Sequence, residues 1–235
     1  MIAGLIAGAA RVVSGATVFW AQPPAQEPSV YIANHSSHLD FVVLWASLPV
    51  EVRRRTRPVA ALDYWQGGIR RFVADRVFHA LLIERHSAKA VAATAAVAHP
   101  GAGNDPADDV EIAVSASPVS GALRVRGEKA RQAIARMIEV LDQGSSLILF
   151  PEGSRDGSGS APFRSGLYYL CSSRPAIPVV PVYLENLNRI MPKGALLPVP
   201  LLSRVIIGQP FHIEKDESRR EYLARAQTKV MELHP

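Results

Sequence analysis

The 235-residue sequence contains a single cysteine, Cys171. One thiol cannot build an intramolecular disulfide framework, so a disulfide-stabilised secreted domain is excluded and a reducing compartment is expected. Cys171 could still be a nucleophile, but its apolar surroundings, "LYYLCSSRP", favour core packing. Hydrophobic residues make up 48% of the chain and charged residues 20%, which excludes fibrous and disordered proteins.

The sequence also lacks a clean transmembrane run. Its one apolar candidate is residues 1–20, and about 20 apolar residues are needed to span a bilayer. Arg11 interrupts this stretch, and no basic region precedes it as in a secretory signal. We therefore expect residues 1–22 to form an N-terminal membrane-associating helix that lies on the bilayer, with a core helix or a span as alternatives. This predicts a peripheral or N-terminally anchored protein at the cytoplasmic face of the membrane.

Charge is unevenly distributed along the chain. The net charge is +5, and residues 51–86 contain eight arginines against four acidic residues. Such a patch suits nucleic acid, anionic lipid or a phosphorylated metabolite, although a plain solvated face has the same composition. Residues 90–123 contain no lysine or arginine and are rich in proline and glycine, which indicates an insertion within a domain spanning 23–235.

Short apolar runs alternate with segments of helical periodicity, which indicates α/β layering. The predicted strands are 29–33, 58–62, 80–84, 146–150, 179–184 and 204–208. The predicted helices are 41–47, 69–77, 130–141 and 218–233. We therefore expect an α/β fold with a central, mostly parallel or mixed sheet flanked by helices. Pro178 and Pro181 around one strand predict a sheet edge or a bend there.

The stretch "NHSSHLD", residues 34–40, follows the first of these strands. His35 and Asp40 can meet if His35 lies on the strand-to-helix turn and Asp40 lies in the first helical turn. Asp40 would then accept a hydrogen bond from the imidazole and leave Nε2 free as a base. Two alternatives remain at this point. Ser37 and Asp40 match a capping box, and His35, His38 and Asp40 could together bind a metal.

A second polar stretch, "FPEGSR" at residues 150–155, follows another apolar strand. Ligands bind at the carboxyl ends of strands in open α/β sheets, and an arginine there can bind phosphate through two donors. A charged surface turn is the alternative. Arg85 also follows a predicted strand, where most arginines are only solvated.

Together these blocks resemble the 1-acylglycerol-3-phosphate O-acyltransferase family of glycerolipid acyltransferases. That family shows Asn-His, four residues and Asp, then Gly, four residues and Arg, then Phe-Pro-Glu-Gly-Thr/Ser-Arg, then a strand with paired prolines. The corresponding segments here are 34–40, 80–85, 150–155 and 177–182, in the same order. Ala80 stands where the family has glycine.

The resemblance implies transfer of an acyl chain from an acyl thioester to the free hydroxyl of a lysophospholipid, with 1-acylglycerol-3-phosphate as the expected acceptor and phosphatidate as the product. It implies His35 as general base and Asp40 as its partner, with His38 a bystander and Ser36 or Ser37 capping the next helix. The residues expected to hold the acceptor phosphate or shape its pocket are Arg85, Glu152, Gly153, Ser154, Arg155 and Arg164.

The resemblance also implies that no metal or cofactor is needed, that acyl-CoA or acyl-carrier protein is the co-substrate, and that nucleic acid is not a partner. Alternatives are an acyltransferase acting on another lyso-lipid, a non-catalytic protein that binds anionic lipid, and a metal-dependent hydrolase using His35, His38 and Asp40.

Overall fold

Seven strands form one mixed sheet in the computed structural model, which describes residues 2–24, 26–37, 39–65, 67–83, 127–153, 161–187 and 202–235. The strand order is β1-β7-β6-β2-β5-β3-β4. The strands are β1 (Thr17–Trp20), β2 (Val30–Ala33), β3 (Thr56–Ala61), β4 (Leu81–Ile83), β5 (Ser146–Leu149), β6 (Val179–Glu185) and β7 (Arg204–Ile207). Strands β6, β2, β5, β3 and β4 run parallel, whereas β7 is antiparallel to β6 and carries β1 parallel to itself.

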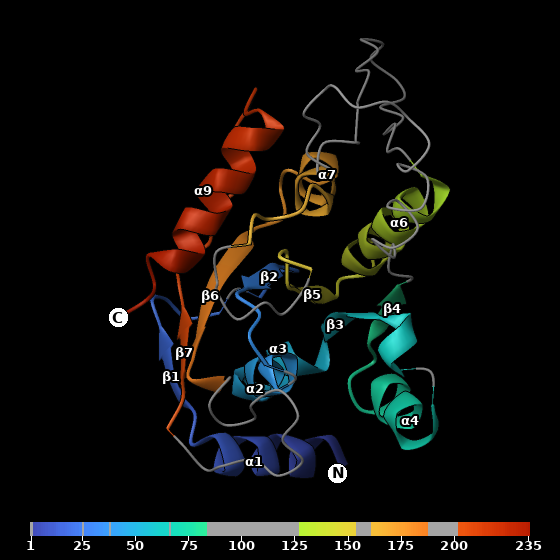
Figure 1. Ribbon diagram of the computed structural model, residues 1–235, viewed down its shortest axis with the longest axis vertical. Helices are drawn as coiled ribbons and strands as arrows, with labels where there is room; N and C mark the ends of the chain where they lie inside the picture. The colour runs from blue at the N-terminus through green and yellow to red at the C-terminus, as the bar shows by residue number, and fades with distance from the viewer. Residues whose placement is uncertain are drawn as a thin grey trace, which may run out of the picture.

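Helices cover both faces of this sheet (Figure 1). One face carries α1 (Ile2–Ser14), α2 (Asp40–Ser47), α3 (Val50–Arg54), the 3-10 turn η1 (Leu62–Trp65) and α4 (Gly68–Arg76). The other carries α6 (Glu128–Asp142), α7 (Gly166–Ser173) and α9 (Arg219–Met231). The described part of the chain is therefore a three-layer α/β sandwich, as expected from the alternation of strand-like and helix-like segments.

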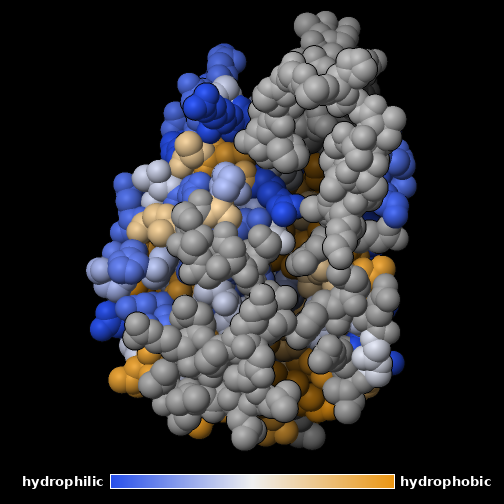
Figure 2. Space-filling model, in the orientation of Figure 1, coloured by the Kyte–Doolittle hydropathy of each residue, from blue (hydrophilic) through white to orange (hydrophobic). Residues whose placement is uncertain are grey.

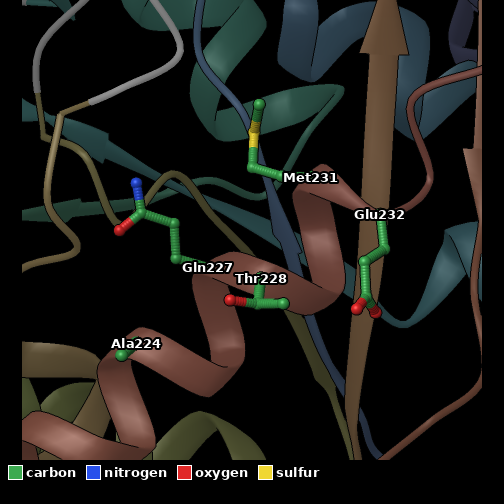
Figure 3. Close-up of a pocket in the computed structure, with 5 residues that line it drawn as sticks. All are labelled: Ala224, Gln227, Thr228, Met231 and Glu232. Carbon is green, nitrogen blue, oxygen red and sulfur yellow. The ribbon is translucent and has the colours of Figure 1, made fainter.

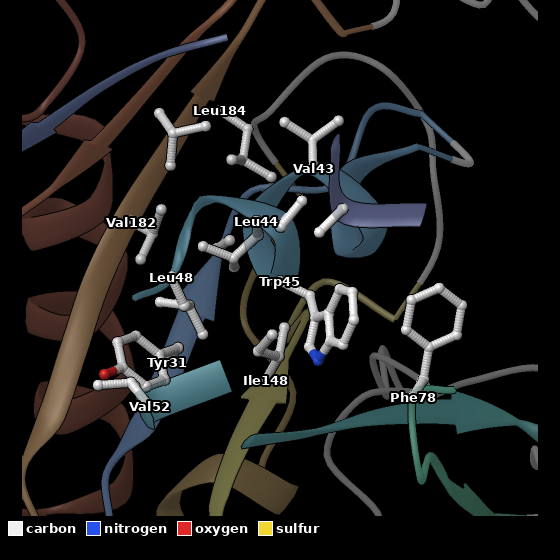
Figure 4. Close-up of a cluster of buried hydrophobic side chains, with 14 of the residues drawn as sticks. Tyr31, Val43, Leu44, Trp45, Leu48, Val52, Phe78, Ile148, Val182 and Leu184 are labelled. Carbon is white, nitrogen blue, oxygen red and sulfur yellow. The ribbon is translucent and has the colours of Figure 1, made fainter. Parts of the chain in front are cut away.

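Each face of the sheet has its own apolar core, because successive side chains of a strand point to opposite faces. On β2, Tyr31 and Ala33 join the core under α2, whereas Val30 and Ile32 join the core under α6 and α7. All four residues of β2 are buried, as expected for a strand covered by helices on both sides. Figure 4 shows the first core, where side chains of α2 pack against β2, β5 and β6.

The six predicted strands and four predicted helices are all present, with ends shifted by a few residues. The prediction of one helix over residues 1–22 is wrong in its second half. Helix α1 ends at Ser14, because Gly15 takes a positive φ of 53°, which ends a helix readily. Residues 17–20, "TVFW", are β-branched or aromatic, and they pair with β7 as an edge strand of the sheet. The N-terminal segment is thus built into the same sheet as the rest of the described chain.

The paired prolines do not mark a sheet edge, since β6 lies between β2 and β7. Pro181 instead falls where the β6–β7 ladder is interrupted. Regular pairing ends at Val182 opposite Ile207. The Gly208 N–H still donates to the Pro181 carbonyl at 2.8 Å, and a single bridge follows between Val179 and Phe211. Pro181, which has no N–H to donate, thus lies directly beyond the last regular pair of the β6–β7 ladder, and the prediction of a sheet edge is wrong.

None of the helices in the described ranges has both the length and the apolarity needed to cross a bilayer. Helix α1 packs against α2, and Arg11 donates from Nε to the carbonyl of Ala46 at 2.8 Å. The charge that interrupts the apolar N-terminus is therefore used at the C-terminal end of α2, where a cation is favoured. The expected insertion at 90–123 lies outside the described residues.

Candidate active site

The candidate site lies at the carboxyl ends of β2 and β5. These strands are parallel neighbours, with Ile32 opposite Leu149, so the segments that follow them leave the sheet side by side. The first segment is 34–37 and the second is 150–153. This is the edge at which open α/β sheets place ligands, and the topology brings together two of the sequence blocks there.

His35 contacts Asp40 directly. The His35 Nδ1 and Asp40 Oδ2 atoms are 2.8 Å apart, with His35 on the loop after β2 and Asp40 as the first residue of α2. The two side chains can meet because His35 precedes the helix and Asp40 lies in its first turn. With Nδ1–H donating to the carboxylate, the lone pair of Nε2 remains available to accept a proton.

The Asp40 carboxylate is held more firmly than one contact to His35 would require. Its Oδ2 also accepts the backbone N–H groups of Ser36 at 2.6 Å and Ser37 at 2.8 Å, and the side chain is fully buried. Two main-chain donors thus fix the carboxylate on the loop that carries His35. Oδ1 is buried and has no hydrogen-bond partner among the described residues.

The capping interpretation is half right. Asp40 does reach back to the N–H of Ser37, as the acidic residue of a capping box would. However, the N-cap position of α2 is Leu39, with no side-chain cap, so neither Ser36 nor Ser37 caps the helix. The Ser37 hydroxyl accepts the N–H of Leu39 instead, at 3.3 Å.

The segment after β5 supports His35 from two sides. The Glu152 side chain is 3% exposed, and its Oε1 accepts the backbone N–H of His35 at 3.3 Å. The Phe150 ring stacks on the imidazole, with ring centroids 4.4 Å apart and planes 28° apart. The Phe150 ring therefore covers one face of the imidazole, and Glu152 fixes the His35 backbone. The His35 side chain is still 15% exposed.

Gly153 and Arg164 meet on the same turn. Gly153 has a positive φ of 71°, and its N–H donates to the Phe150 carbonyl at 3.1 Å, which closes the turn. A Cβ at Gly153 would lie 2.7 Å from Cδ and Cζ of Arg164. Only glycine therefore allows the arginine side chain to lie across this turn.

Asn34 has a structural role that the sequence pattern did not reveal. Its Nδ2 donates to the Leu184 carbonyl at 3.0 Å, and its Oδ1 accepts the Leu184 N–H at 2.7 Å. The amide thus extends the β2–β6 pairing one step beyond the last backbone pair, Ala33 with Val182. This fixes the start of the loop that carries His35. A buried asparagine directly after an apolar strand is a weak signal for such a bridge.

Four residues named from the sequence lie outside the described residues: Arg85, Ser154, Arg155 and His38. The phosphate-binding roles of the first three stay predictions. No group of three or more potential metal ligands occurs in the described ranges. The metal alternative depends on His38 and is therefore untested.

Cys171 lies in the second core, 3% exposed, and burial raises its pKa to about 12. At neutral pH it is a protonated thiol inside the protein, which confirms core packing. A separate open pocket of about 460 Å³ lies along α9 and is lined by Ala224, Gln227, Thr228, Met231 and Glu232 (Figure 3). None of these residues belongs to the four sequence blocks, so this pocket is distinct from the candidate site.

Two curated plant proteins align with part of this chain. One is a chloroplastic 1-acyl-sn-glycerol-3-phosphate acyltransferase of Brassica napus, 33% identical over 98 residues, which are 37% of this chain and 27% of that protein. The other is a chloroplastic protein of the same name from Arabidopsis thaliana, 33% identical over 87 residues, which are 35% of this chain and 23% of that protein. The chain thus matches about a quarter of the length of these relatives.

The fold is similar to that of a solved structure, the 1-acyl-sn-glycerophosphate (LPA) acyltransferase PlsC from Thermotoga maritima. The TM-score is 0.65, and the match covers 99% of this chain and 77% of that one. Sequence identity is 16%, so this likeness concerns the fold alone. The family model described as Acyltransferase matches residues 18–185, which include all but the first residue of β1, the strands β2 to β6 and both segments of the candidate site. The chain therefore belongs to the acyltransferase family.

Proposed function

We propose that the protein transfers an acyl chain from an acyl thioester to the free hydroxyl of a lysophospholipid, with 1-acylglycerol-3-phosphate as acceptor and phosphatidate as product. The observation that carries this proposal is the contact of 2.8 Å between His35 Nδ1 and Asp40 Oδ2. The names of the plant relatives and of the solved structure supply the choice of acceptor.

In the proposed reaction, His35 Nε2 removes the proton of the acceptor hydroxyl while the hydroxyl oxygen attacks the thioester carbonyl. The imidazolium that forms is stabilised by the negative charge of Asp40 through Nδ1–H. The tetrahedral intermediate then collapses, the C–S bond breaks, and the departing thiolate takes the proton from Nε2. The ester product and free thiol leave His35 in its starting state, so neither an acyl-enzyme nor a metal is required.

Acyl-CoA or acyl-carrier protein would enter only as the co-substrate. A phosphate on the acceptor suits the arginines assigned to this region, of which Arg164 lies across the turn at Gly153. Its guanidinium can bind a phosphate through two parallel donors.

The proposed base is tested by His35→Ala, assayed with lysophosphatidate and acyl-CoA by release of the free thiol. We expect kcat to fall by about 10²–10⁴-fold, the usual contribution of a general base. Thioester turnover near the wild-type rate would contradict the mechanism. If the wild-type protein releases thiol but mass spectra show no phosphatidate, thioester cleavage is supported and lysophosphatidate is contradicted as the acceptor.

We also propose that α1 attaches the protein to the cytoplasmic face of the membrane. Three large apolar side chains of α1 point into solvent, with Ile2 57%, Leu5 73% and Val12 81% exposed. Hydrophobic atoms lie along the lower edge of the molecule in Figure 2, where Figure 1 has α1. Arg11 is also exposed, but its Nε binds the Ala46 carbonyl, which directs its guanidinium toward α2.

A double substitution, Leu5→Glu with Val12→Glu, tests membrane attachment. Burial of each such side chain contributes about 1.5–3 kcal/mol, so cosedimentation with vesicles containing phosphatidylglycerol should fall by more than tenfold. Met231→Glu is the matched control, because Met231 is 37% exposed on α9, which covers the opposite face of the sheet. Equal vesicle binding by all three proteins would remove α1 from the proposal.

A further inference from the structure

Arg164 is fastened to three consecutive residues of the turn after β5. Its backbone N–H donates to the Pro151 carbonyl at 2.9 Å, and its Nε donates to the Glu152 carbonyl at 3.2 Å. Its side chain also lies across Gly153, where a Cβ would meet the guanidinium. Both the backbone and the guanidinium of Arg164 thus contact this turn.

The same turn supports the proposed base. Glu152 accepts the backbone N–H of His35, and Phe150, directly before Pro151, stacks on the imidazole. A displacement of the turn would therefore move two of the three groups that fix His35, with Asp40 as the third. Displacements of about 1 Å at reacting groups can change rates by about a hundredfold.

We propose that Arg164 is a positioning residue that couples acceptor binding to the placement of His35. Its Nε is committed to the turn, whereas its terminal amino groups hold no hydrogen bond within the described part of the chain. The guanidinium is planar and rigid. If its terminal amino groups bind the phosphate while Nε binds the turn, the distance between the phosphate and the turn is fixed. The acceptor hydroxyl is thereby held at a fixed position relative to Nε2 of the imidazole. This inference rests on the proposed role of His35.

Arg164→Lys and Arg164→Ala separate positioning from simple charge attraction. Lysine keeps the positive charge, but all of its donors lie on one nitrogen, so it has no separate Nε to hold the turn while another nitrogen binds the phosphate. We expect kcat at saturating lysophosphatidate to fall at least tenfold in both variants, and KM for lysophosphatidate to rise further in Arg164→Ala than in Arg164→Lys. An Arg164→Lys variant with kcat within twofold of wild type would overturn the proposal and leave Arg164 as a plain phosphate ligand.

Arg174→Lys is the matched control. Arg174 follows α7 and binds the Asp142 carboxylate at 2.8 and 2.6 Å on the surface, so its replacement should leave kcat unchanged. His35→Ala, measured in parallel, distinguishes the two levels of the argument. Loss of turnover in His35→Ala with normal kcat in Arg164→Lys would contradict only this inference, whereas normal turnover in His35→Ala would contradict the proposed function.

Gly153→Ala, made in the wild-type and Arg164→Ala backgrounds, gives a second measurement that does not depend on the lysine variant. The strain of alanine at a φ of 71° acts in both backgrounds, but the collision with the guanidinium exists only when Arg164 is present. We expect Gly153→Ala to reduce kcat at least fivefold more in the wild-type background than in Arg164→Ala. An equal reduction in both backgrounds would show that the two residues act independently and would overturn the proposal.

Discussion

Replacement of Asp40 by asparagine separates its charge from its shape. Asparagine can still offer an oxygen to Ser36, Ser37 and the imidazole, which share Oδ2 in the native protein. What it cannot offer is the negative charge that stabilises the imidazolium. A hydrogen bond to a charged group contributes about 1.5–3 kcal/mol. At about 1.4 kcal/mol per factor of ten, kcat should fall roughly 10- to 150-fold.

The same substitution should also destabilise the protein. The new Nδ2 would take the place of Oδ1, which is buried and has no partner among the described residues. An unsatisfied buried donor costs about 1–3 kcal/mol. For a chain of this size Tm should therefore fall by about 2–12 °C. Activity must be measured well below this lowered Tm.

The assay is thiol release from acyl-CoA at saturating lysophosphatidate, with circular dichroism melting on the same samples. Asp142→Asn is the matched control, because Asp142 pairs with Arg174 and its side chain is 47% exposed. Its kcat should equal that of the wild type. If folded Asp40→Asn retains kcat within threefold of the wild type, Asp40 only ties the loop to α2 and the proposed dyad is refuted.

Asn34→Ala should lower the free energy of unfolding by about 2–4 kcal/mol, because it leaves the buried N–H and carbonyl of Leu184 without their partner. Urea titration measures this loss, and a loss below about 1 kcal/mol would contradict the role of Asn34. Iodoacetamide should label Cys171 only as fast as the protein unfolds, since burial raises its pKa to about 12, and rapid labelling of the native protein would show that the thiol is accessible. The free energy of unfolding should fall as pH rises from about 9 to about 12. Burial, opposed in part by Arg55, raises the pKa of Tyr31 to about 12, and burial raises the pKa of Cys171 to about 12 as well. Both groups then hold their protons more tightly in the folded state, so constant stability between pH 8 and 11 would contradict their burial.

Local periodicity was sufficient to predict most of the secondary structure. The strands β2 and β5 are short apolar runs, and α6 shows its apolar face every three to four residues. Strand β1 was missed because Thr17–Trp20 continues an apolar stretch that starts as a helix. Its strand identity depends on pairing with β7, which lies almost at the other end of the chain. Such a partner leaves no trace in a local pattern.

The candidate site likewise contains contacts that the sequence could predict and contacts that it could not. The contact between His35 and Asp40 could be predicted, because it depends only on where one strand ends and one helix begins. The contacts of Asn34 with Leu184 and of Glu152 with the His35 backbone join residues more than a hundred positions apart. They follow from the order β6-β2-β5 in the sheet, which spacing along the sequence does not specify.

Helix α2 connects the proposed membrane-binding surface to the proposed base. It begins with Asp40, which holds His35, and the carbonyl of Ala46 near its other end holds Arg11 of α1. An eight-residue helix is about 12 Å long. An interfacial helix is buried about 5–10 Å into the headgroup region. In the proposed arrangement, one short helix thus joins the membrane-contacting helix to the base, through Ala46 near one end and Asp40 at the other.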